Sequence, residues 1–129
     1  MVGSVIAHYK ILRQVGSGGM GAVYEATDQR FGVRVAVKIL RPDFSNNREA
    51  ITRFINEAAA ANLVAHPSLV KVLDSGQQPD GTAYLVMEFL DGETLSQRLR
   101  RYRGPMPEVE VRRFGWQLAS GLAAAHKKT

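Results

Sequence analysis

A glycine-rich loop near the start of the chain limits the possible folds more than any other feature of the sequence. Gly16, Gly18 and Gly21 have the spacing GxGxxG, and Gly19 adds a fourth glycine to the same loop. Residues 22–27 then read as a β-strand, because they include valine, tyrosine and threonine. A glycine loop between two strands exposes backbone amides over a phosphate, whereas the loop of a dinucleotide-binding fold opens a helix. The sequence therefore predicts two strands whose connecting loop covers a phosphate group.

A lysine in the next apolar segment separates this interpretation from an ordinary hairpin turn. With 12 glycines among 129 residues, the spacing by itself also fits a turn that needs positive φ. Lys38 follows Gly21 by seventeen residues and lies between apolar residues at positions 35–37 and 39–40. This strand is expected to be largely buried, so its cation requires a nearby acid. The loop lacks the Gly-Lys-Ser/Thr ending of a P-loop, which excludes that class of site.

The composition indicates one soluble domain with a modest core, since 45% of the residues are hydrophobic and 22% are charged. No cysteine is present, which excludes a disulfide framework and thiolate metal sites. His8, His66 and His126 lack the close spacing of metal ligands, so no metal site is predicted. Residues 1–8 do not read as a signal peptide, and no apolar run is long enough to cross a bilayer. These features predict a cytoplasmic location, with a membrane anchor outside this segment as an open alternative.

The net charge of +5 is concentrated in the last third of the sequence. Residues 94–129 contain eight lysines or arginines and two glutamates, a balance of +6, whereas residues 1–93 carry −1. Arg98, Arg100, Arg101 and Arg103 have only Tyr102 as an interleaved aromatic residue, so no nucleic-acid partner is expected. A solvated helix end is the favoured interpretation, and a basic surface for an acidic partner is the alternative.

Hydrophobic periodicity predicts an α+β fold. Strands are expected at residues 9–15, 22–27, 33–40, 70–73 and 83–89, which form a five-stranded antiparallel sheet. A helix capped by Ser45, Asn46 or Asn47 is expected between the third and fourth strands, ending before Pro67. Its predicted apolar face contains Ile51, Phe54, Ile55, Ala58 and Leu63.

Two further helices are expected after the sheet. Thr94 and Gln97 have the spacing of a capping box, which begins a short helix that runs to about Arg101. A longer amphipathic helix is expected from Glu108 to the end of the chain. Its apolar positions are Val111, Phe114, Leu118, Leu122 and Ala125.

Five segments in this order and spacing resemble the protein kinase family, and in particular bacterial serine/threonine kinases of the eukaryotic-like type. The resemblance extends from Tyr9 to His126. Its segments are the glycine loop at 15–23, the strand at 35–38, the residues Arg53, Phe54 and Glu57, the residues 66–70, and the hinge at 84–92. It implies the ATP-binding N-terminal lobe and hinge over residues 9–92, including the helix αC. It also implies the first helices of the C-terminal lobe, αD and αE, over residues 93–129.

The resemblance also implies the role of each site residue. Lys38 corresponds to the lysine that holds the α- and β-phosphates of ATP, and Glu57 corresponds to its acidic partner. If this pair is buried, loss of one member is expected to cost about 3–5 kcal/mol. Met87 corresponds to the gatekeeper, and Glu88 and Leu90 to the hinge residues whose backbone bonds adenine. The remaining cofactor-binding positions are Val15, Gly16, Ser17, Gly18, Gly19, Met20, Gly21, Val23 and Ala36.

The family's catalytic loop and its Mg²⁺ ligands would follow His126. Residues 1–129 are therefore expected to transfer no phosphate by themselves, although the family as a whole phosphorylates protein serine and threonine with ATP and Mg²⁺. A non-catalytic nucleotide-binding or scaffold module, such as a pseudokinase, is the alternative. Burial of the apolar face of the last helix would contribute roughly 6–12 kcal/mol, so self-association through that helix is expected.

Overall fold

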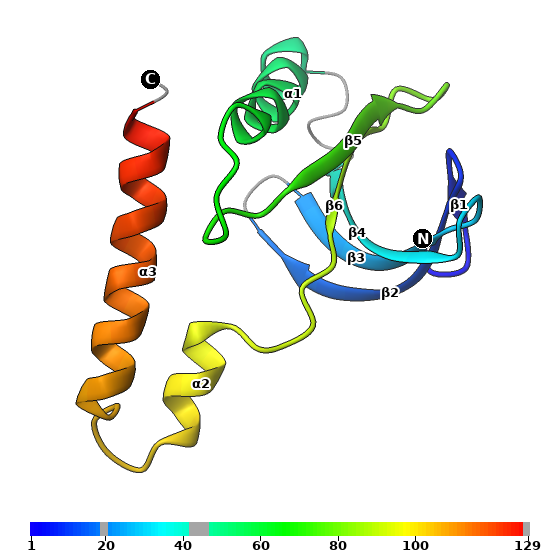
Figure 1. Ribbon diagram of the computed structural model, residues 1–129. Helices are drawn as coiled ribbons and strands as arrows, with labels where there is room; N and C mark the ends of the chain where they lie inside the picture. The colour runs from blue at the N-terminus through cyan, green and yellow to red at the C-terminus, as the bar shows by residue number, and fades with distance from the viewer. Residues whose placement is uncertain (19–20, 42–46, 128–129) are drawn as a thin grey trace. The chain divides into compact units, whose positions relative to one another are not determined.

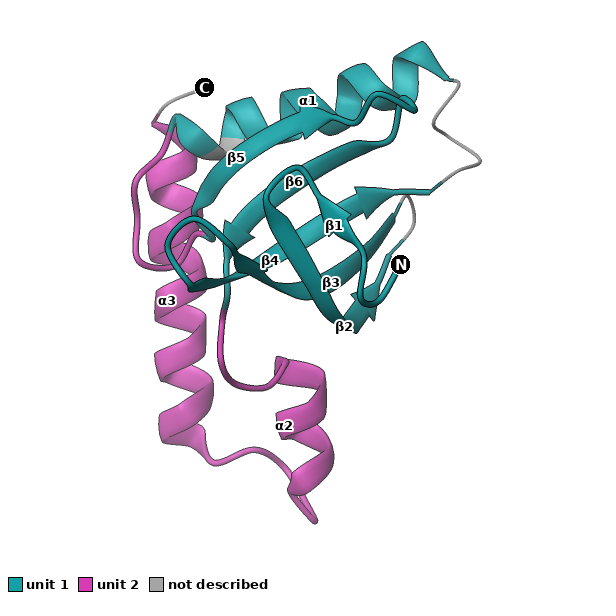
Figure 2. Ribbon diagram, turned by 90° about the vertical axis from the view of Figure 1, so that its right-hand side faces the viewer, with its two compact units in different colours: residues 1–63, 70–89 teal, residues 64–69, 90–129 magenta. Residues whose placement is uncertain are grey.

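The computed structural model describes residues 1–18, 21–41 and 47–127, without the side chain of Ala61. The chain divides into two compact units (Figure 2). The first contains residues 1–63 and 70–89, and the second contains residues 64–69 and 90–129. No helix among the described residues is long and apolar enough to span a membrane.

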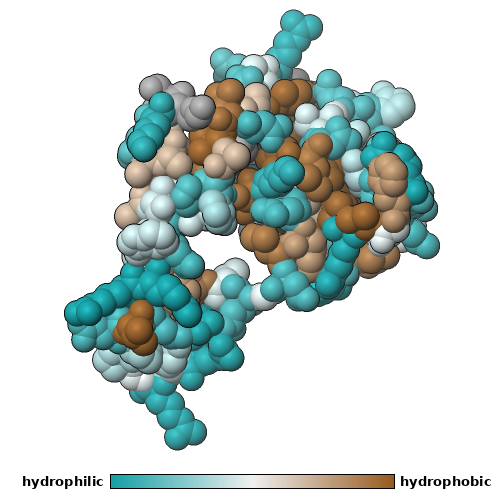
Figure 3. Space-filling model, viewed as in Figure 1, coloured by the Kyte–Doolittle hydropathy of each residue, from teal (hydrophilic) through white to brown (hydrophobic). Residues whose placement is uncertain are grey.

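The first unit is a curled antiparallel sheet with one helix (Figure 1). The strand order is β1-β2-β3-β4-β6-β5. The elements are β1 (Val5–Ile6), β2 (Tyr9–Ser17), β3 (Gly21–Asp28), β4 (Val33–Leu40), α1 (Arg48–Asn62), β5 (Val72–Gln77) and β6 (Ala83–Glu88). On the face seen in Figure 3, hydrophobic residues gather over this unit.

Strand β4 is buried on both of its faces. Val35, Val37 and Ile39 point into the apolar cluster inside the curl of the sheet, which also contains Ile11 and Val86. The second cluster lies against α1 and contains Leu40, Phe54, Ala58, Val72, Ala83 and Leu85. Because side chains alternate along a strand, the residues of β4 that do not face the first cluster share the face toward α1.

The predicted α+β class and the antiparallel sheet are confirmed, but the strand count is six rather than five. The additional strand is β1, whose residues pair with Lys10 and Tyr9. This strand has only two residues, too few to show an alternating pattern in the sequence. Ile6 is nevertheless only 3% exposed, because the strand covers one end of the core. Ala7 has a φ of 53°, and this backbone conformation allows the tight connection to β2.

The strand expected at 70–73 lies instead at 72–77. Its second half contains Ser75 and Gly76, which have little preference for strands, so pairing with β6 determines this segment rather than local propensity. A Cβ atom at Gly76 would lie 2.6 Å from the hydroxyl oxygen of Tyr84. A larger residue would have to displace the Tyr84 ring of the neighbouring strand, a constraint that the local sequence does not reveal.

Helix α1 begins at one of the three predicted caps. The Asn47 side chain accepts a hydrogen bond from the backbone nitrogen of Ala50 at 3.2 Å, whereas residues 45 and 46 lie outside the described residues. Phe54 and Ala58 are buried as predicted. Ile55 and Leu63 were placed on this face incorrectly, because they are 36% and 65% exposed. The buried stripe is narrow because the helix covers only one edge of the sheet.

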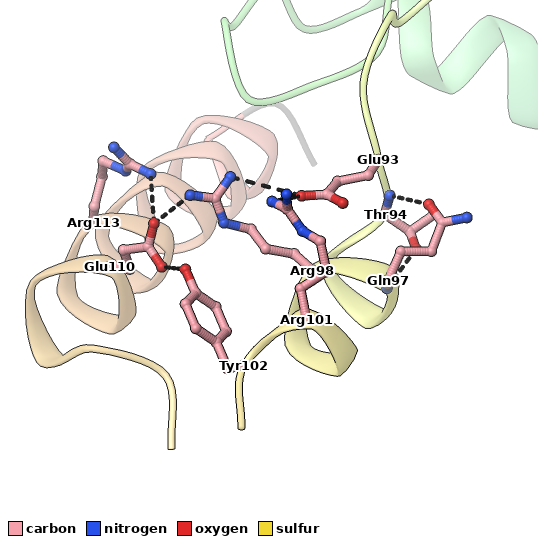
Figure 4. A network of polar contacts seen from close by, with 8 residues as sticks. All are labelled: Glu93, Thr94, Gln97, Arg98, Arg101, Tyr102, Glu110 and Arg113. Atoms are coloured by element: carbon pink, nitrogen blue, oxygen red, sulfur yellow. Dashed lines mark hydrogen bonds and ion pairs between the residues drawn. The ribbon is translucent and has the colours of Figure 1, made fainter. Parts of the chain in front are cut away.

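The second unit contains two helices, α2 (Leu95–Arg101) and α3 (Glu108–His126). The predicted capping box of α2 is present (Figure 4). The Thr94 nitrogen donates to Gln97 Oε1 at 2.8 Å, and the Gln97 nitrogen donates to Thr94 Oγ1 at 3.1 Å. In the loop at 64–69, His66 Nδ1 accepts a hydrogen bond from the Ser68 nitrogen at 3.0 Å. Its Nε2 lies 3.0 Å from Ser120 Oγ, which links the loop to α3.

Several arginines of the basic segment are engaged in ion pairs within the second unit (Figure 4). Arg98 contacts Glu110 and lies 3.9 Å from Glu93, and its guanidinium is 5.4 Å from the ring centroid of Phe114. Arg101 contacts Glu93 at 2.5 Å. Arg98 and Arg101 therefore join α2 to its preceding loop and to α3.

We expect Gly21→Ala to destabilise the first unit, because its Cβ atom would lie 2.2 Å from the carbonyl oxygen of Ile39. The strands β3 and β4 would have to separate at this point, at a cost of about 1–3 kcal/mol. Urea unfolding followed by circular dichroism measures the change. Gly16→Ala is the matched control, because a Cβ atom there has no neighbour within 4 Å and should change the free energy of unfolding by less than about 0.5 kcal/mol. Equal effects of the two substitutions would contradict the packing argument.

Candidate nucleotide-binding site

One face of the sheet brings together the lysine and most of the apolar residues that the sequence identifies. Lys38 pairs with Val23 of β3, and Ala36 pairs with Met87 of β6. Directly opposed residues on neighbouring strands project to the same face, so these four side chains share one surface. Ala36 is buried, and Val23 and Met87 are partly buried. The surface therefore offers an apolar patch next to a cation, as a purine base and its phosphates require.

The cation of this surface is paired with a residue from α1. Lys38 Nζ lies 3.7 Å from Glu57 Oε1 and 5.9 Å from the ring centroid of Phe54. The side chain of Lys38 is 25% exposed, but that of Glu57 is 62% exposed. The acid is therefore mostly exposed, and the cost expected for breaking a buried pair does not apply to it. An exposed pair of this kind contributes about 0–1 kcal/mol to stability.

The glycine loop is a continuation of the β2–β3 pairing. The last pair of the ladder is Ser17 with Ala22, and the Gly18 nitrogen donates to the Gly21 carbonyl oxygen at 2.8 Å. Arg41 Nη2 donates to the Gly18 carbonyl oxygen at 3.0 Å, which holds the loop from the end of β4. Two of the predicted positions, Gly19 and Met20, lie outside the described residues.

Different structural constraints explain why glycine occupies each of these positions in the loop. Gly21 is required by packing, since its Cβ atom would overlap the backbone of Ile39. Among the described residues, nothing lies within 4 Å of a Cβ atom at Gly16 or Gly18, and neither has the positive φ that favours glycine. Contacts within the described part of the chain therefore do not explain them. A ligand that approaches the backbone closely would explain them. Val15, beside a β-bulge, is 42% exposed.

The segment predicted to be the hinge leaves the sheet at the end of β6. Glu88 Oε1 accepts a hydrogen bond from the Lys71 nitrogen at 3.0 Å, and the Glu88 nitrogen donates to the Lys71 carbonyl oxygen at 3.0 Å. The Glu88 side chain thus fixes the approach to β5. Leu90, the other predicted hinge residue, belongs to the second unit and is 63% exposed.

The sequence interpretation missed a polar cluster on the same face of the sheet. Glu25, only 8% exposed, contacts Arg34 at 2.9 Å and Arg13 at 3.1 Å. The hydrogen bond from Arg34 is the largest influence on the Glu25 carboxyl and, with Arg13, lowers its pKa against the opposing effect of burial. The signal was available in the sequence, because Glu25 follows Val23 by two residues and must share its face if the strand is regular.

The described residues offer no obvious ligands for Mg²⁺. Among them, no group of three or more acidic, histidine or cysteine side chains is placed to hold a metal ion. We therefore assign the ion no ligand within this part of the chain.

The chain matches the family described as "Protein kinase domain" over residues 9–129, and it therefore belongs to the protein kinase family. It is 39% identical over 123 residues to the serine/threonine-protein kinase PrkC of Bacillus subtilis, with coverage of 95% of this chain and 19% of that protein. It is 42% identical over 120 residues to the serine/threonine-protein kinase Pkn2 of Myxococcus xanthus, with coverage of 93% and 14%.

Solved structures agree with this assignment. The crystal structure of the Mycobacterium tuberculosis PknI kinase domain matches with a TM-score of 0.81 and 30% sequence identity, covering 98% of this chain and 51% of that one. The chain thus spans about half of a solved kinase domain and less than a fifth of the length of the two curated relatives. The similarity to bacterial serine/threonine kinases is confirmed.

We expect Glu57→Gln to change the free energy of unfolding by less than about 1 kcal/mol, because the carboxylate is mostly exposed. Chemical denaturation checks this value. Phe54→Ala is the contrasting variant on the same helix, since Phe54 is only 1% exposed and its truncation should cost about 3–5 kcal/mol. A loss of 3 kcal/mol or more on Glu57→Gln would mean that the ion pair is a structural element rather than a surface contact.

Proposed function

We propose that residues 9–92 form the ATP-binding lobe and hinge of a serine/threonine protein kinase, and that residues 93–129 begin its C-terminal lobe. The observation that carries this proposal is the position of Lys38, on one face with Val23, Ala36 and Met87 and 3.7 Å from Glu57. In such a kinase the γ-phosphate of ATP passes to a serine or threonine hydroxyl of a protein substrate. The family membership and the named relatives support this reaction class.

Each residue of the face has a role in holding the nucleotide. The Lys38 ammonium donates hydrogen bonds to oxygens of the α- and β-phosphates, and Glu57 orients that ammonium. Backbone amides of the described part of the glycine loop, residues 16–18 and 21, cover the phosphates, because glycines at 16 and 18 leave room for close approach. The base contacts Val15, Val23 and Ala36, with Met87 behind it. Backbone groups of Glu88 and Leu90 bond its polar edge.

We propose further that residues 1–129 by themselves bind nucleotide weakly and transfer no phosphate. The general base and the Mg²⁺ ligands of the family have no counterpart within these residues, and loss of a general base alone lowers the rate by about 10²–10⁴. A dissociation constant for ATP near or above about 1 mM is expected, which corresponds to about −4 kcal/mol. The alternative, a non-catalytic nucleotide-binding module, requires substantially tighter binding.

An NMR titration of the purified chain with ATP tests the site. We expect millimolar binding with shifts in the amides of the glycine loop, and Lys38→Met should weaken the binding of ATP about tenfold or more while leaving the binding of adenosine nearly unchanged. Lys10→Met is the charge-matched control, because Lys10 is an exposed residue of β2. Micromolar affinity would favour the non-catalytic module. Transfer of radiolabelled phosphate by the pure chain, abolished by Lys38→Met, would contradict the proposed inactivity.

We also propose that this polypeptide self-associates through α3. Three of the predicted apolar positions, Val111, Leu118 and Leu122, are 52%, 60% and 57% exposed. Within the second unit, Phe114 and Leu118 of α3 line a cavity together with Leu95 of α2, and the volume of this cavity is about 870 Å³. Exposed apolar side chains that lie along one helix face favour association with a second apolar surface.

Sedimentation velocity over a wide range of concentrations tests the association. We expect a dimer or larger species at high concentration, and Leu118→Glu should shift the population to monomer because it places a charge in the apolar face. Val109→Glu is the matched control. Val109 is 74% exposed and, nine residues away, lies on the opposite side of the helix from Leu118. A monomer at every concentration would refute the self-association.

A further inference from the structure

An arginine at the outer end of the ATP-binding face has no role in the function proposed above. Arg34 precedes Ala36 and Lys38 on β4 by two and four residues, so the three side chains share a face of the sheet. The pairing of Val35 with Glu88 places Arg34 opposite Phe89, the next residue after β6. Arg34 therefore lies beside the hinge, at the end of the face that is away from the glycine loop.

The guanidinium of Arg34 is held in place by two contacts. Its Nη2 atom donates a hydrogen bond to Glu25 Oε1 at 2.9 Å, and the same oxygen also accepts a hydrogen bond from Arg13 Nη2 at 3.1 Å. The guanidinium carbon lies 4.1 Å from the ring centroid of Phe89, well within the range of a cation–π contact. The Glu25 side chain is 11% exposed, so the acceptor of these charge-assisted hydrogen bonds is largely desolvated.

Phe89 occupies the position in the hinge where this contact has a functional consequence. It stands between Glu88 and Leu90, whose backbone groups are proposed to bond the edge of adenine. A side chain fixed at Phe89 limits the φ and ψ angles of its own residue, and these angles set the direction of both neighbouring peptide groups. The geometry points to a positioning residue: we propose that Arg34, held by Glu25 and stacked on Phe89, keeps the hinge backbone in the conformation that binds the base.

This inference rests on the proposed function. A positioning role for Arg34 and a merely structural role predict different effects on ligand binding. An ion pair that only joined β3 to β4 would alter stability and would affect every ligand of the face equally. A hinge-positioning residue acts on the base and leaves the phosphate end unaffected, because the hinge contacts only the base. The two ends of the ligand can therefore be tested separately.

The test measures the binding of two probes by NMR titration of the full chain. Adenosine carries the base without phosphates, and inorganic tripolyphosphate carries phosphates without a base. We expect Arg34→Leu to raise the dissociation constant for adenosine about three- to tenfold, while that for tripolyphosphate changes by less than about twofold. Arg34→Lys should give an intermediate value, since lysine keeps the charge but loses the planar stacking.

Arg13→Leu is the matched control. It removes the other cation of Glu25 and leaves the contact with Phe89 in place, so adenosine binding should stay within about twofold of the wild type. Thermal unfolding of each variant shows whether it is folded. Equal losses for Arg13→Leu and Arg34→Leu, or equal losses for the two probes, would overturn the positioning role. A wild-type chain that binds neither probe would overturn the proposed function, and this inference with it.

Discussion

The alternation of side chains along β4 is the constraint on which the fold and the site both depend. Val35, Val37 and Ile39 enter the apolar cluster inside the curled sheet, which leaves Ala36 and Lys38 on the other face. A shift of one residue in the register would turn Lys38 into the apolar cluster inside the sheet and remove the valines from that cluster. The position of the cation is thus fixed by the burial of its neighbours. Because β3 and β6 pair with β4 on either side, the same register places Val23 and Met87 beside it.

The elements with strong local signals were predictable from the sequence, and those set by distant contacts were not. Residues 33–40 are mostly apolar and β-branched, a pattern that strongly favours a strand. The bounds predicted for this strand match the structure. The capping box at Thr94 is equally local, because the two groups that bond each other are three residues apart. In contrast, Gly76 lies in a strand because β5 pairs with β6, which the local sequence does not show.

The candidate site shows the same division. The spacing of the glycines, Lys38 and Glu57 identifies the residues, and the structure brings the last two to 3.7 Å. Spacing does not determine how much of each side chain is exposed, so the exposure of Glu57 is seen only in the structure. It also does not show which charged residues meet from different strands. Glu25, Arg34 and Phe89 come from three separate strands or strand ends, and only the sheet register brings them into contact.

The two cations on the face of β4 differ in how firmly they are held, and this difference matches the two ends of the proposed ligand. Lys38 has a mostly exposed partner at 3.7 Å, beyond ordinary hydrogen-bond distance, so its ammonium can turn toward a phosphate at little cost. Arg34 donates at 2.9 Å to a nearly buried carboxylate and stacks on an aromatic ring. Moving that guanidinium would break both contacts and leave Glu25 with only Arg13. A loosely held cation can reach the phosphates of the proposed ligand without breaking a strong contact, whereas a fixed one suits the base, which must stay in register with the hinge.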